Sequence, residues 1–357
     1  GIYSMSSELS DVVLDTRIRL ARFFDCDDDP VKFCKRIIFT SGVTQSINVF
    51  LRGLLNHGDH IITGSLEHHA VMRTLNDLEK ERGITFDVAR CDENGTVSAL
   101  AVESLINMNT KAVIINHASN VFGTISPIEE IGAVCKKHNI FFAVDTAQTA
   151  GAVEISMRKA NIDFLAFSGH KGLLALQGIG GFAISKRLSD ILKPIITGGT
   201  GSVSHSYIQP AILPDKFESG TLNLAGIVSL NHSLEFIEKT GVDKIREKEL
   251  ELRSYFIKKV QKIDGIKVYC ADDKLSTTSV VSLSFTELDN AYVASILERK
   301  YSIMTRCGLH CALSAHRAMG TYPDGTVRFS FSYFNSIEEI KYCIDSLKDI
   351  LKEINNA

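Results

Sequence analysis

Short apolar segments alternate with amphipathic segments over much of the chain. Six apolar segments between residues 37 and 184 are each short enough to be a buried strand, at 37–40, 60–63, 112–116, 141–144, 164–167 and 181–184. Helix-like segments lie between them at 44–55, 70–82, 97–106 and 128–138. Strands that are buried on both faces are continuously apolar, so this alternation predicts a mostly parallel sheet covered by helices on both faces.

The pattern changes towards the C-terminus. Two longer helices are predicted at 223–239 and 242–263, followed by alternating segments typical of half-buried strands at 266–270, 278–285 and 327–331. Further helices are predicted at 289–299 and 336–354. We therefore expect a large α/β domain over residues 25–240 and a smaller α+β domain formed by residues 1–24, with their helix, together with residues 241–357.

Composition excludes several classes of protein. The 357 residues are 45% hydrophobic and carry a net charge of -3, which gives no electrostatic indication of nucleic acid or anionic membrane binding. No apolar run approaches the ~18 residues of a membrane span, and residues 1–10 lack the features of a secretory signal. The eight cysteines are mostly isolated along the sequence, which favours free thiols in a reducing cytoplasm.

Polar residues that suit ligand binding follow the predicted strands. In an open α/β sheet, ligands bind at the carboxyl ends of the strands. In chain order these residues are Ser41-Gly42-Val43-Thr44, His68, Asn120, Asp145 with Gln148, and Ser168 with His170 and Lys171. Residues 41–44 open a helix, as either a simple capping turn or a cradle for an anion. They lack the Gly-Lys-Ser/Thr of a nucleoside triphosphate loop.

Lys171 and Asp145 together indicate a specific cofactor. A lysine directly after a buried strand, between His170 and Gly172, is unusual for a solvated loop charge. Its amine can form a Schiff base, and the carboxylate of Asp145 can hold the proton of a pyridine nitrogen. With a phosphate cradle nearby, this combination predicts pyridoxal 5'-phosphate as the cofactor.

These residues belong to a set of segments that resembles the class V aminotransferase family of fold-type I pyridoxal-phosphate enzymes. Within that family it resembles the group II cysteine desulfurases and selenocysteine lyases. The matching segments, in order, are FTSGVTQSIN at 39–48, EHHA at 67–70, SNVFGT at 119–124, DTAQ at 145–148, SGHK at 168–171 and GT at 220–221. The resemblance implies a large domain with a mostly parallel, seven-stranded type of sheet and a smaller α+β C-terminal domain.

The resemblance also implies a role for each matching residue. Lys171 would bind the cofactor covalently, Asp145 would pair with its pyridine nitrogen, Gln148 would reach its phenolic oxygen and His68 would stack on its ring. Val43, Thr44, Ser168 and His170 would hold the phosphate, and Gly220 and Thr221 would complete the phosphate site of the neighbouring subunit in a homodimer. Asn120, Arg328 and Arg306 would bind the substrate, since the planar fork of an arginine matches a carboxylate.

The segment TRCGLHCA at 305–312 distinguishes the branches of the family. A metal site is disfavoured, because two cysteines and one histidine lack the second half of a ligand set. A buried structural thiol is the ordinary interpretation of a cysteine. The segment resembles the loop of group II desulfurases that carries their nucleophile, which corresponds to Cys311. Arg306 and His310 would favour its thiolate, so we favour a nucleophile. Cys307 receives no role.

The predicted reaction converts L-cysteine to L-alanine and leaves a persulfide on Cys311. Selenocysteine would follow the same route, and the sulfur would pass to an acceptor protein or thiol. The resemblance implies a cytoplasmic enzyme of sulfur metabolism, including iron–sulfur cluster assembly. It also implies a first strand with an Asp-Asn-Ala-Ala-like segment, and we expect Gly1 to lie after that strand. Alternatives are a C–S lyase or aminotransferase that does not use Cys311, and a non-catalytic scaffold of the same fold.

Overall fold

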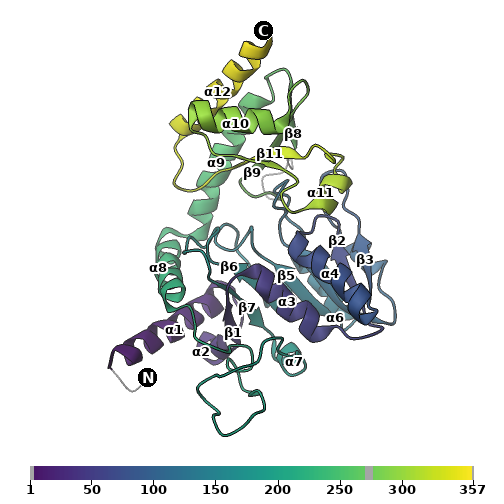
Figure 1. Cartoon of the computed structure of the whole chain (residues 1–357), viewed down its shortest axis with the longest axis vertical. Coiled ribbons are helices and arrows are strands. Elements are labelled where there is room, and N and C mark those ends of the chain that lie inside the picture. Colours follow the sequence, from purple (N-terminus) through teal and green to yellow (C-terminus); the bar gives the residue numbers. More distant parts are fainter. Residues whose placement is uncertain (1–3, 270–275, 356–357) are drawn as a thin grey trace.

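The computed structural model describes residues 4–269 and 276–355, which form two sheets with their helices (Figure 1). The larger sheet has seven strands in the order β1-β7-β6-β5-β4-β2-β3. Its strands are β1 (Ile37–Thr40), β2 (His60–Gly64), β3 (Thr85–Ala89), β4 (Thr110–Asn116), β5 (Phe141–Asp145), β6 (Phe164–Ser168) and β7 (Gly180–Ile184). Only β7 is antiparallel to its neighbours, so the prediction of a mostly parallel sheet is confirmed.

Alternate residues of these strands belong to two separate cores, one on each face of the sheet. In β4, Val113 and Ile115 belong to one core, and Ala112 and Ile114 belong to the other. This division follows from strand geometry, since successive side chains point to opposite faces. A strand that is apolar at every position therefore needs helices on both faces.

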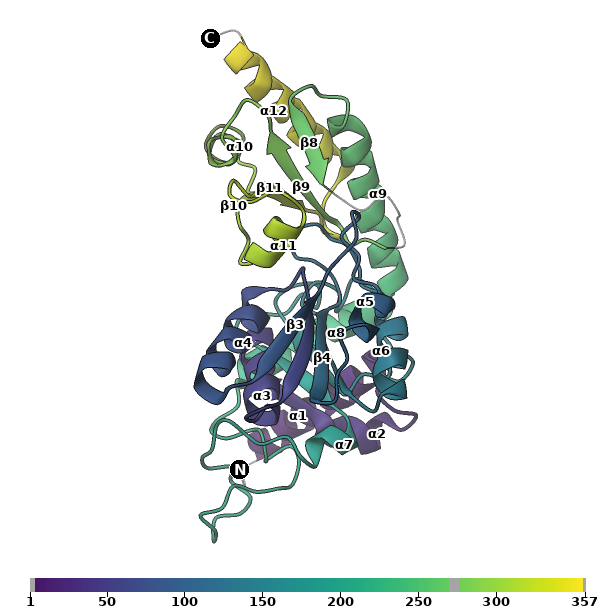
Figure 2. The same cartoon turned by 90° about the vertical axis from the view of Figure 1, so that its right-hand side faces the viewer.

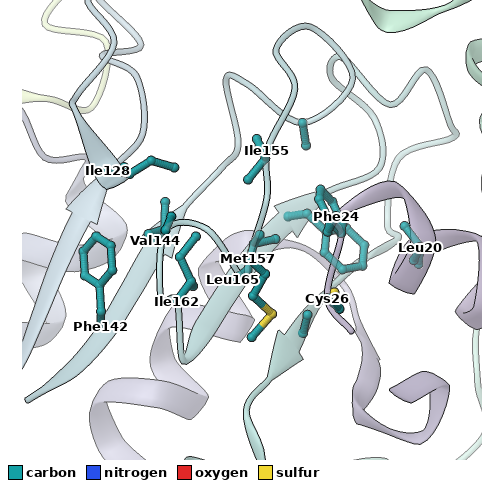
Figure 3. Close-up of a cluster of buried hydrophobic side chains, with 14 of the residues drawn as sticks. Leu20, Phe24, Cys26, Ile128, Phe142, Val144, Ile155, Met157, Ile162 and Leu165 are labelled. Carbon is teal, nitrogen blue, oxygen red and sulfur yellow. The ribbon is translucent and has the colours of Figure 1, made fainter. Parts of the chain in front are cut away.

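Helices cover both faces of the large sheet. One face carries α1 (Ser4–Phe23), α5 (Ala99–Glu103), α6 (Ile128–Lys137) and α8 (Leu224–Thr240), and the other carries α3 (Val43–Leu54), α4 (His69–Arg82) and α7 (Lys186–Ser189). A short helix, α2 (Pro30–Phe33), follows α1. Figure 3 shows the core beneath the first group, where Leu20 and Phe24 lie near Met157 and Leu165.

The position of α1 corrects the expected domain grouping. Leu20 and Ala21 of this helix, and Phe24 directly after it, are fully buried in the core of the large sheet. The amide of Asn231 in α8 donates to the Asp15 carboxylate of α1 at 2.8 Å. Residues 1–24 were expected to join the smaller domain, but the apolar face of α1 is buried against α8 and the large sheet.

The second sheet is antiparallel and has the order β10-β11-β9-β8. Its strands are β8 (Ile266–Tyr269), β9 (Val280–Phe285), β10 (Arg306–Gly308) and β11 (Thr326–Ser330). Its helices are α9 (Val242–Val260), α10 (Asn290–Tyr301), α11 (Leu313–Ala318) and α12 (Ile337–Asn355). Side chains of α9, α10 and α12 share one core with β9 and β11. Figure 2 shows α11 on the side of this unit that faces β3 and α4.

A buried ion pair fastens α1 and the segment before Gly220 to β1. The Arg17 guanidinium lies 2.6 Å from the Glu218 carboxylate, and both side chains are less than a tenth exposed. The other oxygen of Glu218 accepts the backbone N–H of Phe39 at 2.7 Å. Arg17 also donates to the carbonyl oxygen of Ile37. The two side chains therefore compensate each other's charge in a site that water does not reach.

We predict that Glu218→Ala lowers the free energy of unfolding by about 3–5 kcal/mol, because it leaves the Arg17 charge buried without a partner. The matched control is Glu238→Ala, which removes the carboxylate 2.5 Å from Arg19 in a more exposed pair. The control is expected to cost about 1 kcal/mol or less. Urea unfolding of both variants at equal protein concentration measures the two losses. Equal, small losses would contradict the prediction.

Candidate active site

A cavity of about 320 Å³ lies at the carboxyl ends of the parallel strands of the large sheet. Ten residues singled out in the sequence line it, namely Val43, Thr44, His68, Asn120, Asp145, Gln148, Ser168, His170, Lys171 and Arg306. Five strands and the second sheet bring these residues together from distant parts of the chain. These residues therefore meet at one edge of the sheet, whereas their individual roles remain predictions.

The first turn of α3 lines this cavity and is not capped by a side chain. Gly42 precedes the helix with a φ of 152°, and no side chain caps the helix start. The backbone N–H of Val43 donates to the Ser168 hydroxyl at 3.3 Å, which places β6 next to this turn. The first N–H groups of a helix have no partner within it, so this turn can bind an anion such as a phosphate.

Asp145 and Lys171 both line the cavity, and the charge of each affects the pKa of the other. Asp145 ends β5, is 5% exposed and accepts the backbone N–H of Ala147 at 2.8 Å. Burial raises the pKa of its carboxyl, and the charge of Lys171 lowers it. Loss of hydration lowers the pKa of the Lys171 ammonium, Asp145 raises it, and Arg328 and Arg306 lower it again. An amine with a lowered pKa is unprotonated more often, which suits a nucleophile or a base.

The imidazole of His68 is neutral, and its hydrogen bond fixes a single tautomer. It stands directly before α4, and its Nδ1 accepts the backbone N–H of Ala70 at 3.1 Å. Burial and then Lys171 lower its pKa to about 4. At neutral pH the ring therefore carries its single proton on Nε2 and presents an uncharged face to the cavity.

Arg306 and Arg328 of the second sheet bring two guanidinium groups to the site, although Arg328 does not itself line the cavity. They stand opposite each other on β10 and β11, and Arg306 lines the cavity. The Nη1 of Arg328 donates to the carbonyl oxygen of Asn120 at 2.8 Å, whereas its buried Nε has no partner. The side-chain oxygen of Asn120 also has none. These unpaired polar atoms are groups that a bound substrate with both donor and acceptor atoms can satisfy.

The loop that carries Cys311 is held against the large sheet by the backbone. His310 and Cys311 both have positive φ, 51° and 58°, which is costly for residues other than glycine. The carbonyl oxygen of Cys311 accepts the backbone N–H of His69 at 2.7 Å. The carbonyl oxygen of His310 accepts the side-chain amide of Asn120 at 2.8 Å. Two contacts from the large sheet therefore stabilise the unusual backbone at the predicted nucleophile.

The Cys311 thiol lies beside Arg306. Its Sγ is 3.5 Å from the Arg306 Nη2, and the residue is half-buried. His310 was expected to assist the thiolate as well, but burial lowers the pKa of its ring to about 4. It is neutral at pH 7, and its Nε2 lies 3.0 Å from the Arg306 carbonyl oxygen. Only Arg306 of these two neighbours brings a positive charge to the thiol.

The imidazole of His310 belongs to a buried chain of hydrogen bonds. Since a carbonyl oxygen only accepts, Nε2 of His310 donates to Arg306, and its Nδ1 is left as an acceptor. The His316 Nε2, 3.4 Å away, donates to that Nδ1, and the His316 Nδ1 accepts the Thr321 hydroxyl at 2.7 Å. Burial lowers the pKa of His316 to about 4. These neutral rings fix the Cys311 loop to α11.

Four predicted site residues do not line the cavity. Cys311 and Arg328 lie next to Arg306, which does line it. Gly220 and Thr221 are exposed and do not line the cavity of their own chain. This position agrees with the expectation that they serve a neighbouring subunit, but that role stays a prediction.

The site also contains residues that the sequence analysis did not single out. Asn116, the last residue of β4, lines the cavity, and its place at the carboxyl end of an apolar segment was a signal that could have found it. Glu67 is fully buried, and one of its oxygens accepts the backbone N–H of Asn116 at 2.8 Å. Burial raises the pKa of Glu67 well above its ordinary value, and its second side-chain oxygen has no hydrogen-bond partner.

The remaining described cysteines divide by burial. Cys26, Cys34, Cys135 and Cys343 are buried, and burial raises the pKa of each thiol. A buried thiol of raised pKa is unreactive, as expected for packing. Cys270 lies outside the described residues. Cys91 is half-buried, and Cys307 is exposed on β10.

Among residues 4–269 and 276–355, no cluster of three histidine, cysteine, aspartate or glutamate side chains has the arrangement of a metal site. In the same ranges, every helix is too short or too polar to cross a membrane.

The neutral histidines predict how stability depends on pH. The ordinary pKa of 6.5 applies in the unfolded chain, and the folded pKa of His316 is about 4. Between these values the unfolded state binds the proton and the folded state does not, so stability falls as the pH falls through this window. His316→Leu should reduce this slope by up to about 1.4 kcal/mol per pH unit.

Urea unfolding across the same pH window measures the slope for wild type and His316→Leu. His232→Leu, which removes an exposed histidine of α8, is the control. A slope unchanged by His316→Leu would show that His316 is protonated alike in both states.

Comparison with known proteins identifies the family. Residues 1–343 match the family model described as Aminotransferase class-V. A probable cysteine desulfurase of Methanothermobacter thermautotrophicus is 31% identical over 355 residues, which cover 98% of this chain and 86% of that relative. A probable cysteine desulfurase of Pyrococcus abyssi is 31% identical over 366 residues, which cover 100% of this chain and 88% of the relative.

A solved structure supports the same assignment. The apo structure of cysteine desulfurase from Thermococcus onnurineus NA1 is 30% identical in sequence and has a TM-score of 0.91. The match covers 99% of this chain and 87% of that one. The expected fold class, with a mostly parallel seven-stranded sheet and a smaller α+β part, is confirmed. The chain belongs to the class V aminotransferase family.

Proposed function

We propose that the protein is a pyridoxal-phosphate-dependent cysteine desulfurase, which converts L-cysteine to L-alanine and collects the sulfur on Cys311. The observation that carries this proposal is the position of the Cys311 loop beside the cavity. Its thiol lies 3.5 Å from Arg306, a residue that lines the same cavity as Lys171 and Asp145. The names of the relatives support the same reaction.

The residues of the cavity fit the proposed cofactor. The uncapped first turn of α3, with Thr44 and Ser168, would hold the phosphate, together with His170. Gln148 lines the cavity on the side of Asp145 and would reach the phenolic oxygen. The neutral face of His68 suits stacking on a flat ring. Lys171 would hold the cofactor covalently, and the buried Asp145 would keep the pyridine nitrogen protonated.

The substrate would be held by its carboxylate. Arg328 has a buried donor without a partner, and Asn120 contributes polar atoms beside it. Arg306 stands next to Arg328 across β10 and β11 and completes the positive surface. A guanidinium pairs with a carboxylate through two parallel hydrogen bonds, which fixes the orientation of the substrate.

The bound cofactor would withdraw electrons from the substrate, which acidifies the Cα proton and weakens the bond from Cβ to sulfur. Lys171 would take the Cα proton, since its lowered pKa makes the amine available as a base. The Cys311 thiolate would attack the substrate sulfur. The bond from Cβ to sulfur breaks, its electron pair stays on carbon, and protonation there gives the methyl group of alanine. The sulfur remains on Cys311 as a persulfide.

Further parts of the proposal concern partners and substrate range. A persulfide needs an acceptor, either a protein thiol or a small reductant. L-selenocysteine would bind through the same residues. We propose a cytoplasmic homodimer of sulfur metabolism in which Gly220 and Thr221 complete the phosphate site of the other subunit. Their exposure and their distance from their own cavity support this arrangement.

Substitution of Cys311 tests the function. We expect Cys311→Ser to lower alanine formation from L-cysteine by about 100-fold or more, because a hydroxyl cannot take up the sulfur. Cys307→Ser is the matched control, as it changes an exposed cysteine of the same segment, and it should retain activity. Alanine and sulfide are measured for both variants. Undiminished alanine from Cys311→Ser would refute the proposal, and pyruvate with ammonia in its place would indicate a C–S lyase.

Mixed dimers test the shared phosphate site. Lys171→Ala and Thr221→Asp should each be inactive alone. If Thr221 serves the neighbouring subunit, a mixed dimer has one intact site, formed by Lys171 of one subunit and Thr221 of the other. Unfolding and refolding both variants together should then restore about a quarter of the wild-type activity, because half of the dimers are mixed and each has one working site. No recovery would place Thr221 at the site of its own chain, and full activity of Thr221→Asp alone would place it outside any site.

A further inference from the structure

A second hollow, of about 1110 Å³, lies where α4, β3 and α11 meet (Figure 2). It adjoins the loop of the predicted nucleophile. Leu313 and Ser314, which line it, follow Cys311 by two and three residues. His69 also lines it and donates its backbone N–H to the Cys311 carbonyl oxygen at 2.7 Å. His68 lines the active-site cavity and His69 lines the hollow, so adjacent residues contact both.

The hollow is apolar within and positively charged at its rim. Half-buried Met72, Val88 and Leu313 supply apolar surface. Three exposed arginines, Arg73, Arg90 and Arg317, also line it.

These arginine charges are not compensated within the hollow. Among the described residues, none of the three arginines forms an ion pair with a carboxylate. The acidic residue that lines the hollow, Asp77, lies 3.3 Å from Arg52, an arginine outside the hollow. Arg317 contacts the ring of Tyr322 instead of a carboxylate. Uncompensated arginines around apolar surface suit an acidic and partly apolar ligand.

We propose that this hollow binds an acidic segment of the protein that accepts sulfur from Cys311. The proposal rests on the proposed function, because it needs the persulfide. The volume exceeds that of most small-molecule sites, which favours a length of polypeptide over a single small anion. An acceptor held there would have its thiol next to the Cys311 loop.

The transfer is balanced in atoms and electrons. The thiolate of the acceptor attacks the outer sulfur of the Cys311 persulfide, and the bond between the two sulfurs of that persulfide breaks. Its electron pair leaves with the inner sulfur, so Cys311 returns as a thiolate and the acceptor carries the persulfide. No oxidant or reductant is required.

Binding is tested first without catalysis. The probes are a short fluorescent peptide rich in glutamate, with serine in place of cysteine, and the same peptide with glutamine in place of each glutamate. Fluorescence anisotropy with the holoenzyme should show tighter binding of the glutamate peptide. Arg90→Glu with Arg317→Glu should weaken that binding about tenfold, since it removes two attractive charges and adds two repulsive ones.

The control lowers the net charge away from the hollow by as much as Arg90→Gln and Arg317→Gln lower it together. Lys32→Glu reverses an exposed charge on α2, which lies on the large sheet far from α11 (Figure 1), and should leave binding unchanged. Arg90→Gln with Arg317→Gln provides a milder pair of changes. Equal binding of the two peptides, or equal loss with Lys32→Glu, would overturn the docking proposal.

An activity measurement separates this proposal from the proposed function. Peptides that carry one cysteine replace the serine versions, and alanine formation is followed with each peptide or with dithiothreitol as the acceptor. The arginine variants should raise the KM for the glutamate peptide about tenfold and leave the dithiothreitol rate unchanged. No alanine from wild type with dithiothreitol would refute the proposed function. Normal alanine formation with dithiothreitol, but the same KM for both peptides, would refute docking alone.

Discussion

Two hydrogen bonds between the sheets create the site. The backbone N–H of His69 and the side-chain amide of Asn120, both from the large sheet, bind the carbonyl oxygens of Cys311 and His310. Without these hydrogen bonds, the conformational cost of positive φ at two consecutive non-glycine residues would not be compensated. Because both donors follow the carboxyl ends of strands in the large sheet, they hold the loop from the second sheet beside the cavity.

The charges of the site are arranged around neutral histidines. His68, His310 and His316 all have a pKa lowered to about 4 by burial, so they act through hydrogen bonds and ring faces at neutral pH. The charged groups are Asp145 and Lys171 within the cavity and the two arginines from the second sheet. A neutral His310 leaves Arg306 as the cation beside the thiol. The buried chain through His316 positions the loop without adding a further charge.

The sequence predicted the parts of the fold that depend on continuous apolar segments. Six of the seven strands in the large sheet, all except β3, are mostly or fully buried and were found in this way. The edge strand β3 was missed because alternate residues such as Thr85 and Asp87 are exposed, so it has no apolar run. β10 was missed because three residues are too few for a pattern. The amphipathic pattern of α1 predicts a helix with one apolar face. It does not specify that this face packs on α8.

The site was predictable to a similar degree. Ten residues that line the cavity follow from strand ends, from the resemblance to the family, or from both. Asn116 ends β4 and could have been found by the same rule. The neutrality of His310 could not be predicted, since it depends on burial against His316, and that burial is visible only in the folded chain. The hollow beside the Cys311 loop is lined in part by residues of β3 and α11, and the sequence pattern predicted neither element.

The central claim is that sulfur from cysteine reaches Cys311. It is tested most directly by a single turnover with sulfur-labelled L-cysteine in the absence of any acceptor thiol, followed by digestion and fragmentation mass spectrometry of the peptide that contains Cys307 and Cys311. The account predicts one labelled sulfur atom on Cys311, none on Cys307, and an equal amount of alanine. Alanine formed without labelled sulfur on Cys311 would contradict it.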